Sequence, residues 1–330
     1  MVQRSIRTHG MLNAGERVLV AVSGGADSVG LLLVFAQLRR KLGVELVAAH
    51  VNHHLRGDDA EADEQCAAAA ATRLGVAFAR ADLDAGLARG GNLEARARRL
   101  RYAALHELAA AHGCAKIATG HTLDDQAETV LMRTLRGAGV RGLTGIRPRR
   151  ADGVIRPLIE STREAVCRVV EQAGLAYRID RSNADPRFLR THVRERVLPL
   201  LRELNPSVNT ALANLATAAR AERAIVARWA DAELAAAAPN GRLPAEWLAA
   251  QPAAVRGVLT RRWLLRGGLG RRGLGARHVQ AVVQLALSAE NRGEAHLPAG
   301  WLARRARGYL SVHRQQPFLE PAVRQSEKLF

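Results

Sequence analysis

The sequence predicts an α/β protein built on a doubly wound parallel sheet, followed by a C-terminal all-helical domain. First, β-branched apolar runs alternate with helical patterns between residues 17 and 173, and such a βαβ series buries a parallel sheet between two helical layers. Second, almost everything from residue 190 onward has helical periodicity. Third, 330 residues with 48% hydrophobic content are enough for two domains, which we place at residues 1–204 and 205–330.

Each expected element follows from a local pattern. The apolar runs predict strands over residues 17–22, 44–51, 76–83, 115–121 and 154–160. The segments between them predict helices near residues 28–42, 58–74, 92–112, 123–136 and 161–173. Asn205 and Pro206 then begin a long alanine-rich helix, which leads into the mainly helical second domain.

The charge of the chain indicates a polyanionic partner. Lysine and arginine number 49 and acidic residues 31, which gives a net charge of +18 that attracts nucleic acid. The alternative is that an arginine-rich chain with only three lysines reflects the codon usage of a GC-rich genome. No apolar run approaches the ~18 residues of a membrane span, and the first residues lack a hydrophobic signal region. We therefore expect a cytoplasmic protein without a membrane partner.

The first chemical motif is the loop that follows the first strand. Its residues are Ser23, Gly24, Gly25, Ala26, Asp27 and Ser28. The glycines let the backbone approach a ligand, the serines add hydroxyl donors, and the next helix begins there with free N–H groups, so the loop predicts a phosphate cradle. It lacks the lysine of the GxxxxGK[ST] loop and is not GxGxxG. Asp27 would repel a phosphate unless a divalent cation lay between them, which implies Mg²⁺.

The second motif follows the fourth strand. His121, Asp124, Asp125 and Glu128 are spaced by three, four and seven residues, so they share one face of a helix. A solvated acidic helix face and a metal cluster are alternatives, although a single histidine disfavours zinc. We favour a pocket for a cationic substrate. A lysine ammonium, with a pKa of ~10.4, must lose a proton before it attacks, and carboxylates can hold the amine and accept that proton.

These motifs resemble a known family. SGGADS is similar to the PP-loop of the N-type ATP pyrophosphatases, which have an adenine nucleotide alpha hydrolase-like fold. Longer blocks at residues 50–64, 91–105, 118–139 and 190–201 resemble the tRNA(Ile)-lysidine synthetases. The resemblance is dense over about residues 15–205, and beyond that it is one of general layout.

The resemblance implies an activity and its partners. That family uses ATP to activate C2 of the wobble cytidine in the CAU anticodon of an isoleucine tRNA. It passes through an adenylated tRNA, releases pyrophosphate and AMP, and joins free L-lysine there, which switches the specificity from methionine to isoleucine. The cofactors implied are ATP and Mg²⁺. The oligomeric state stays open, a homodimer included.

The resemblance also implies roles for residues. Asp125 and Glu128 would bind lysine, while His121 and Asp124 would help to position ATP and the nucleotide. Arg101 matches the arginine that contacts the activated nucleotide or phosphates, with a guanidinium suited to developing negative charge.

Three further segments carry expectations of their own. Arg194, with Arg190 four residues before it, would reach the active site or the tRNA backbone; the alternative is an ordinary helix salt bridge with Glu195. Asn52, His53 and His54 would border the adenine or merely cap a strand. The arginine-rich segment 256–280 is consistent with gripping tRNA phosphates in the second domain.

Two other functions compete. A second PP-loop enzyme, a tRNA thiolase, usually needs a reactive cysteine or a CxxC pair, whereas Cys66, Cys114 and Cys167 are widely separated and indicate buried filler. An RNA-binding protein without enzymatic activity, built on a decayed nucleotide fold, is the third possibility. Decay would have damaged the SGGADS or HTLDDQAE motif first, and both are intact.

Overall fold

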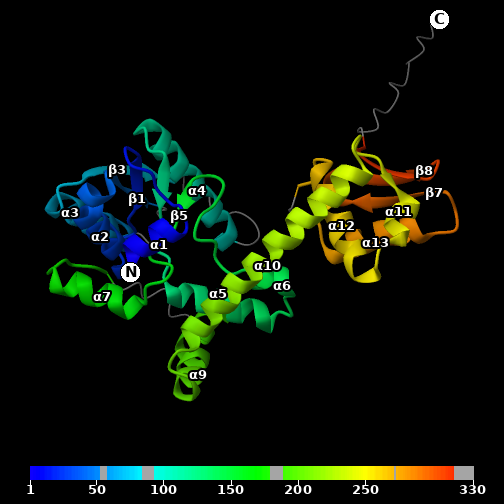
Figure 1. Ribbon diagram of the computed structural model, residues 1–330. Helices are drawn as coiled ribbons and strands as arrows, with labels where there is room; N and C mark the ends of the chain where they lie inside the picture. Colours follow the sequence, from blue (N-terminus) through cyan, green and yellow to red (C-terminus); the bar gives the residue numbers. More distant parts are fainter. Residues whose placement is uncertain (53–57, 84–92, 179–188, 271–272, 316–330) are drawn as a thin grey trace, which may run out of the picture. The chain divides into compact units, whose positions relative to one another are not determined.

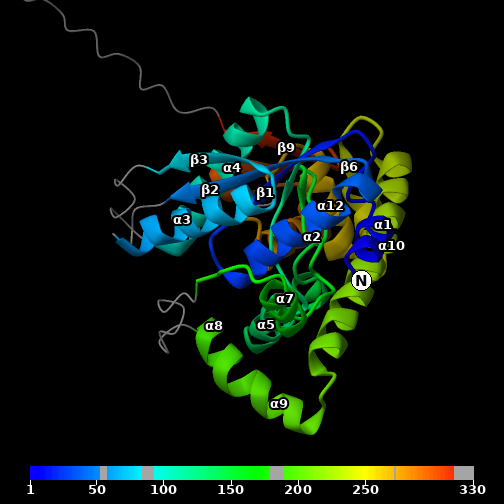
Figure 2. The ribbon, with the colours of Figure 1, turned by 90° about the vertical axis from the view of Figure 1, so that its left-hand side faces the viewer.

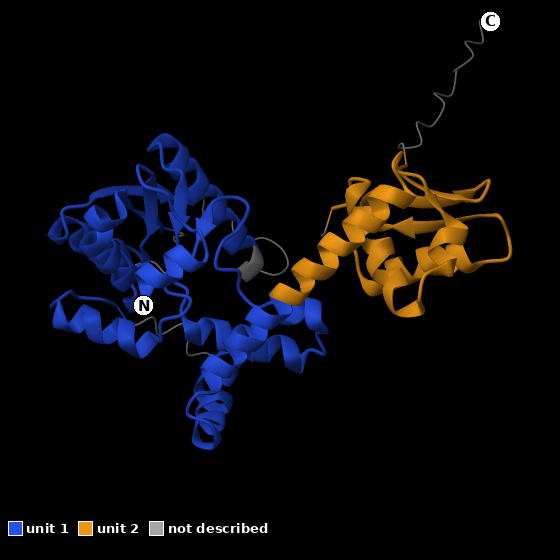
Figure 3. Ribbon diagram, in the orientation of Figure 1, with its two compact units in different colours: residues 1–220 blue, residues 221–330 orange. Residues whose placement is uncertain are grey.

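The computed structural model describes residues 1–52, 58–83, 93–178, 189–270 and 273–315. The chain divides into two compact units, residues 1–220 and 221–330 (Figure 3). No helix in the described ranges is both long and apolar enough to cross a membrane.

A five-stranded parallel sheet forms the centre of the first unit. Its strands are β1 (Arg17–Ala21), β2 (Glu45–Asn52), β3 (Ala77–Asp82), β4 (Lys116–Ala118) and β5 (Val154–Ile155). Their order is β3-β2-β1-β4-β5, and every neighbouring pair is parallel. β1 is the central strand, and its Val18, Leu19 and Val20 are fully buried because both faces of a parallel sheet are covered.

Helices cover both faces of this sheet (Figures 1 and 2). Val18 and Val20 of β1 pack with α2 (Ala26–Leu42), α3 (Asp58–Arg73) and α7 (Arg163–Gln172). Leu19, which points the other way, packs with α4 (Leu93–Ala111). The predicted doubly wound sheet is therefore confirmed.

The other elements of the first unit lie around this sheet. They are α1 (Val2–Thr8), α5 (Leu123–Leu135), α6 (Val140–Leu143), α8 (Leu189–His192), a π-helix (Val193–Val197), α9 (Leu198–Leu204) and the start of α10 (Val208–Ala237). A small core of Ala127, Val193 and Leu198, with Leu212 against it, packs α5 against the π-helix, α9 and α10. This core fixes α5, the helix that carries the second motif.

The second unit combines helices with an antiparallel sheet. Its helices after α10 are α11 (Ala245–Ala250), α12 (Ala253–Arg266) and α13 (Ala276–Leu287). Its strands are β6 (Leu243–Pro244), β7 (Arg292–Leu297), β8 (Trp301–Ala306) and β9 (Tyr309–Arg314), in the order β6-β9-β8-β7.

The helical C-terminal region is thus confirmed, but the description "all-helical" needs correction because it omits this sheet. One face of this sheet packs on the helices, but the strands do not alternate strictly between apolar and polar residues, because β8 has the sequence WLARRA and buries both Leu302 and Ala303. Ala303 and Leu310 are buried, whereas Arg304 and Tyr309 are exposed. Adjacent arginines and adjacent apolar residues in β8 therefore gave the sequence no clear pattern of period two.

Gly30 lets α2 and α7 pack closely. A Cβ added at Gly30 would overlap Cγ1 of Val166 and approach Cγ2 of Val170 to 3.2 Å. Gly257 in α12 is a matched helical glycine, because a Cβ there would meet nothing closer than 3.9 Å. Comparing an alanine substitution at each of these glycines therefore separates the effect of overpacking from that of helix propensity.

We expect Gly30→Ala to lower the free energy of unfolding by about 1–3 kcal/mol, the usual cost of overpacking a core. Val166→Ala in the same chain should recover part of that loss. Gly257→Ala should instead stabilise the protein by about 0.5–1 kcal/mol. Urea unfolding of the four proteins measures these differences, and equal effects at the two glycines would contradict the packing argument.

Candidate active site

The two predicted motifs meet where the sheet reverses its direction of winding. From β1 the chain moves outward to β2 and β3, and from β4 it moves to β5 on the other side. In open α/β sheets, ligands bind at the carboxyl ends of the strands at such a switch point. The loop after β1 and the segment after β4 both lie there, because β1 and β4 are parallel neighbours.

The loop after β1 has the geometry of a phosphate cradle. Gly24 has φ +84°, and a Cβ there would lie 2.8 Å from the carbonyl oxygen of Asp63. Ser28 Oγ accepts a hydrogen bond from Ser23 N at 3.0 Å and donates one to the carbonyl oxygen of Gly25 at 2.8 Å. These bonds tie the loop to the first turn of α2, whose leading N–H groups have no partner within the helix.

Asp27 stands at the start of α2 with one oxygen paired and the other unpaired. Arg163 Nε donates to Asp27 Oδ2 at 2.9 Å, whereas Asp27 Oδ1 is buried without a partner. Burial raises the pKa of Asp27 to about 6, although the charge of Arg163 opposes that shift. An unpartnered carboxylate oxygen beside a phosphate cradle fits Mg²⁺, which commonly takes one or two carboxylates together with phosphate oxygens.

Asp124 connects four elements. Its Oδ2 accepts a hydrogen bond from the backbone N–H of Arg163 at 2.7 Å, at the start of α7. Its Oδ1 accepts from Arg202 of α9 and from Asn209 of α10, both at 3.0 Å. Asp124, predicted as a nucleotide-binding residue, therefore also fixes the position of Arg163.

Asp125 and Glu128 are buried and paired with arginines. Arg190 NH2 donates to Asp125 Oδ1, and Arg190 Nε donates to Glu128 Oε2, both at 2.7 Å. Arg194 Nε donates to Glu128 Oε1 at 2.6 Å. Burial raises the pKa of Asp125, but Arg190 and its other partners outweigh that effect and hold it below its usual value.

This arrangement brings Arg190 and Arg194 into the predicted site. They come from α8 and the adjoining π-helix, an element often found at functional sites. Their carboxylate partners lie 62 to 66 positions away in the sequence, so the helix salt bridge considered from the sequence does not account for them.

His121 is held neutral. Its Nδ1 lies 3.0 Å from Thr119 Oγ1. Burial, with the nearby charge of Arg156, lowers the pKa of His121 to about 3, even though Asp125 acts in the opposite direction. At neutral pH the imidazole can therefore position a ligand by hydrogen bonding but carries no charge.

Arg163 and Arg156 were not predicted from the sequence. Arg163 reaches Asp27 from α7, and its NH2 lies 3.7 Å from Asp125 Oδ1, so it links the two motifs. Arg156 follows β5 directly and is 3% exposed. The available signal was position, because Arg156 lies at the carboxyl end of a strand and Arg163 opens a helix at the same edge.

The other residues predicted from the sequence, Arg101 and Asn52, lie on α4 and at the end of β2. Arg101 is exposed on α4, and Asn52 is buried at the end of β2, with its Nδ2 donating to Glu64 at 3.2 Å. His53 and His54 fall outside the described residues.

Several arginines of the segment 256–280, among them Arg256, Arg261, Arg262 and Arg266, have partners inside the second unit. Arg261 donates to the carbonyl oxygen of Leu274 at 2.6 Å, and Arg262 pairs with Asp231. Phosphates would have to compete with these internal partners.

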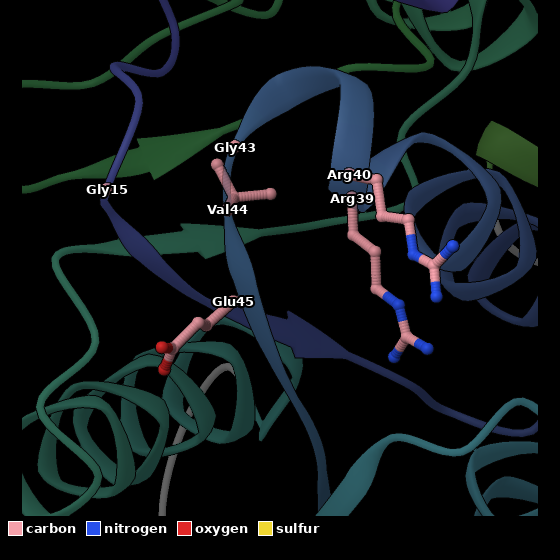
Figure 4. Close-up of a pocket in the computed structure, with 6 residues that line it drawn as sticks. All are labelled: Gly15, Arg39, Arg40, Gly43, Val44 and Glu45. Carbon is pink, nitrogen blue, oxygen red and sulfur yellow. The ribbon is translucent and has the colours of Figure 1, made fainter.

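A separate pocket lies at the opposite edge of the sheet (Figure 4). Arg39 and Arg40 lie in the last turn of α2. Gly15 precedes β1, and Gly43 and Val44 precede β2. Because these are the amino ends of the strands, the pocket is remote from both motifs. The carboxyl edge remains the candidate site.

Known proteins are similar to this chain in sequence and in fold. The PP-loop domain family matches residues 2–201. The tRNA(Ile)-lysidine synthase of Salinispora tropica is 39% identical over 320 residues, which are 94% of this chain and 95% of that protein. That of Symbiobacterium thermophilum is 35% identical over the whole of this chain and 72% of its own length.

Other relatives are longer. The tRNA(Ile)-lysidine synthase of Solibacter usitatus is 40% identical over 87% of this chain, and the chain spans 65% of that relative's length. Among solved structures, the U34-tRNA thiolase NcsA of Methanococcus maripaludis has a TM-score of 0.55 at 18% identity. The match covers 66% of this chain and 76% of the thiolase. That likeness concerns the fold alone.

The neutral state of His121 predicts a pH dependence of stability. Its pKa falls from 6.5 to about 3 on folding, so below pH 6.5 the unfolded chain binds a proton that the folded chain does not. Stability contributed by His121 is therefore complete above pH 6.5 and is lost as the pH falls toward 3.

We expect His121→Gln to become progressively more stable relative to the original chain as the pH falls from 6.5 to 4.5. The difference should grow by up to about 1.4 kcal/mol per pH unit. Urea unfolding at pH 7, 6, 5 and 4.5 measures it. A difference that stays constant over this range would mean that His121 titrates normally in the folded protein.

Proposed function

The chain belongs to the tRNA(Ile)-lysidine synthase family, and we propose on that premise that it joins free L-lysine to an isoleucine tRNA at the expense of ATP. The atom modified is C2 of the wobble cytidine in the CAU anticodon. The observation that carries this proposal is the meeting of a phosphate cradle with two buried carboxylates at one switch point. A PP-loop domain implies the use of ATP.

In the first step, the cytidine O2 attacks the α-phosphorus of ATP and pyrophosphate leaves, which gives an adenylated tRNA. The loop from Ser23 to Ser28 and the N-terminus of α2 would hold the phosphates. Asp27, through its unpartnered oxygen, would hold Mg²⁺, which neutralises phosphate charge when bound. His121 and Asp124 would help to position the nucleotide. Asp124 would do so by accepting the backbone N–H of Arg163, which fixes the position of that arginine.

In the second step, the ε-amine of lysine attacks C2. The C2–O2 bond breaks, AMP leaves with that oxygen, and the amine loses its proton. Asp125 and Glu128 pair with the guanidinium group of Arg190, which supports a pocket where the lysine amine takes the place of a guanidinium. The other arginines near these carboxylates, Arg163 and Arg194, would lower the pKa of a neighbouring lysine ammonium and so favour the neutral, nucleophilic amine.

Arg101 and Arg194 complete the proposed catalytic set. A guanidinium near the departing AMP stabilises the charge that develops on its phosphate. Arg194 already reaches Glu128, and Arg101 precedes the buried Tyr102 on α4. Both roles remain predictions.

We also propose that residues from 205 onward hold the body of the tRNA. Residues 201–330 contain 19 basic and 9 acidic side chains, a net charge of +10, and carry none of the chemical motifs. This division assigns base chemistry to the sheet and affinity to the second part of the chain.

The thiolase alternative has less support. All three cysteines of the chain are described; they are half-buried, not buried as expected from the sequence, and partial burial raises the pKa of each thiol. Raised pKa values disfavour the thiolate that such chemistry requires.

The proposed first step predicts the cleavage products. Incubation with ATP, Mg²⁺, labelled lysine and tRNA should yield AMP and pyrophosphate in step with lysine incorporation. Asp27→Asn should reduce turnover by at least about a hundredfold, because it removes the carboxylate charge next to the phosphates. Chromatography of the labelled nucleotides identifies the products. Stoichiometric ADP and inorganic phosphate would reject the proposed chemistry.

The lysine pocket predicts a separation of the two steps. Asp125→Asn and Glu128→Gln should weaken lysine use by about ten- to a hundredfold, the usual effect of losing a charge-assisted hydrogen bond, while some tRNA adenylation persists. Glu164→Gln is the matched control, because Glu164 is an exposed carboxylate on α7 that pairs only with Arg168 in the described part of the chain. Thermal unfolding confirms that each variant folds. A normal KM for lysine in both pocket variants would refute the assignment.

A further inference from the structure

Arg156 carries a buried charge without a carboxylate partner. Its NH1 donates to the carbonyl oxygen of Arg147 at 2.5 Å, and its NH2 lies 3.5 Å from the Tyr102 hydroxyl. Its Nε is buried with no partner. Within the described ranges, no carboxylate lies within ion-pair distance of Arg156. Burying an uncompensated charge is costly, and native proteins normally pair such a group or give it a ligand.

Arg305 in the second unit provides a contrast. It is also buried with an unpartnered Nε, but its NH1 donates to the carbonyl oxygens of Leu285, Ala286 and Ser288. These carbonyls end α13, where the helix dipole is negative and compensates a cation. Arg305 is therefore explained by the fold, whereas Arg156 is not.

The surroundings of Arg156 are cationic. The guanidinium carbons of Arg98 and Arg150 both lie over the ring of Tyr102, at 5.3 Å and 4.7 Å from its centroid. Arg150 is neutralised by Asp152, but Arg98 is exposed and has no carboxylate partner among the described residues. Burial raises the pKa of Tyr102, yet Arg98 and Arg156 outweigh that effect and hold it below its usual value.

This cluster borders the candidate active site. Arg156 directly follows β5, and β5 pairs with β4, the strand that leads to His121. Arg156 and Arg98 both act on His121 electrostatically. The uncompensated positive charge therefore lies at the same carboxyl edge as the phosphate cradle.

We propose that Arg98, Tyr102 and Arg156 form a binding site for a phosphate group. Arg98 makes the direct contact at the surface, Tyr102 supports its guanidinium, and Arg156 is a positioning residue that supplies fixed positive charge behind them. The phosphate belongs either to the adenine nucleotide or to the RNA backbone beside the target base. The choice of these two ligands rests on the proposed function, but the existence of the site does not.

The test compares Arg156→Met, Arg156→Lys, Arg98→Gln and Arg305→Met in the full chain. Binding of a non-hydrolysable ATP analogue and of a tRNA anticodon stem-loop is measured separately by calorimetry, together with thermal unfolding. Arg156→Met should lower the affinity for one of the two ligands by about ten- to a hundredfold. Its Tm should be unchanged or higher, because the substitution removes a buried uncompensated charge. Arg156→Lys should recover part of the affinity.

The matched control should behave in the opposite way. Arg305→Met should lower the Tm and leave both affinities unchanged. Weakened binding of the ATP analogue assigns the site to the nucleotide. Weakened binding of the stem-loop assigns it to the RNA backbone, and the slope of log K against log salt should then be flatter by about 0.7 for each phosphate that the variant no longer neutralises.

Both ligands binding normally to Arg156→Met and Arg98→Gln would overturn the proposal and make Arg156 a structural arginine like Arg305. If Arg156→Met does not fold, Arg98→Gln decides, because Arg98 is exposed and its replacement leaves the core intact. These are binding measurements, so they stand even if the original chain transfers no lysine. Absence of lysine transfer with intact phosphate binding would reject only the proposed function.

Discussion

The structure depends on the burial of carboxylates at one edge of a parallel sheet. Asp27, Asp125 and Glu128 lie in surroundings where an unpaired charge would be strongly unfavourable. Arginines of α7, α8 and the π-helix pair with these carboxylates and compensate their charge. Because each arginine belongs to an element distant in sequence, the need for charge compensation also determines how those elements pack around α5.

Asp124 extends this constraint to the scaffold. By binding the first backbone N–H of α7 and side chains of α9 and α10, it links the sheet domain to the helices that follow. The same aspartate places Arg163 between Asp27 and Asp125. Asp124 thus both anchors these helices and fixes an arginine of the candidate site, so a substitution at Asp124 would disturb the packing and the site together.

The candidate site has two electrically different sides. Around α5, carboxylates and guanidinium groups alternate and largely cancel. Around Tyr102, Arg98 and Arg156 lack carboxylate partners within the described residues, and their charge helps to keep His121 neutral. A balanced side suits the binding of an amine, and a cationic side suits phosphate. A reaction that joins an amine to a phosphate-activated base needs both.

The sequence by itself determined the parallel sheet, the cradle after β1 and the acidic face of α5, because apolar runs, a glycine pair and helical spacing are local patterns. Only the tertiary structure decided the partners of those groups. Asp27 and Arg163 are 136 positions apart, and all but three of the 49 basic residues are arginines, so composition could not single out Arg156 or Arg163. The antiparallel sheet of the second unit was likewise hidden, since its strands do not alternate strictly between apolar and polar residues. Charge pairing acts through space between residues distant in sequence, so local patterns along the chain do not reveal it.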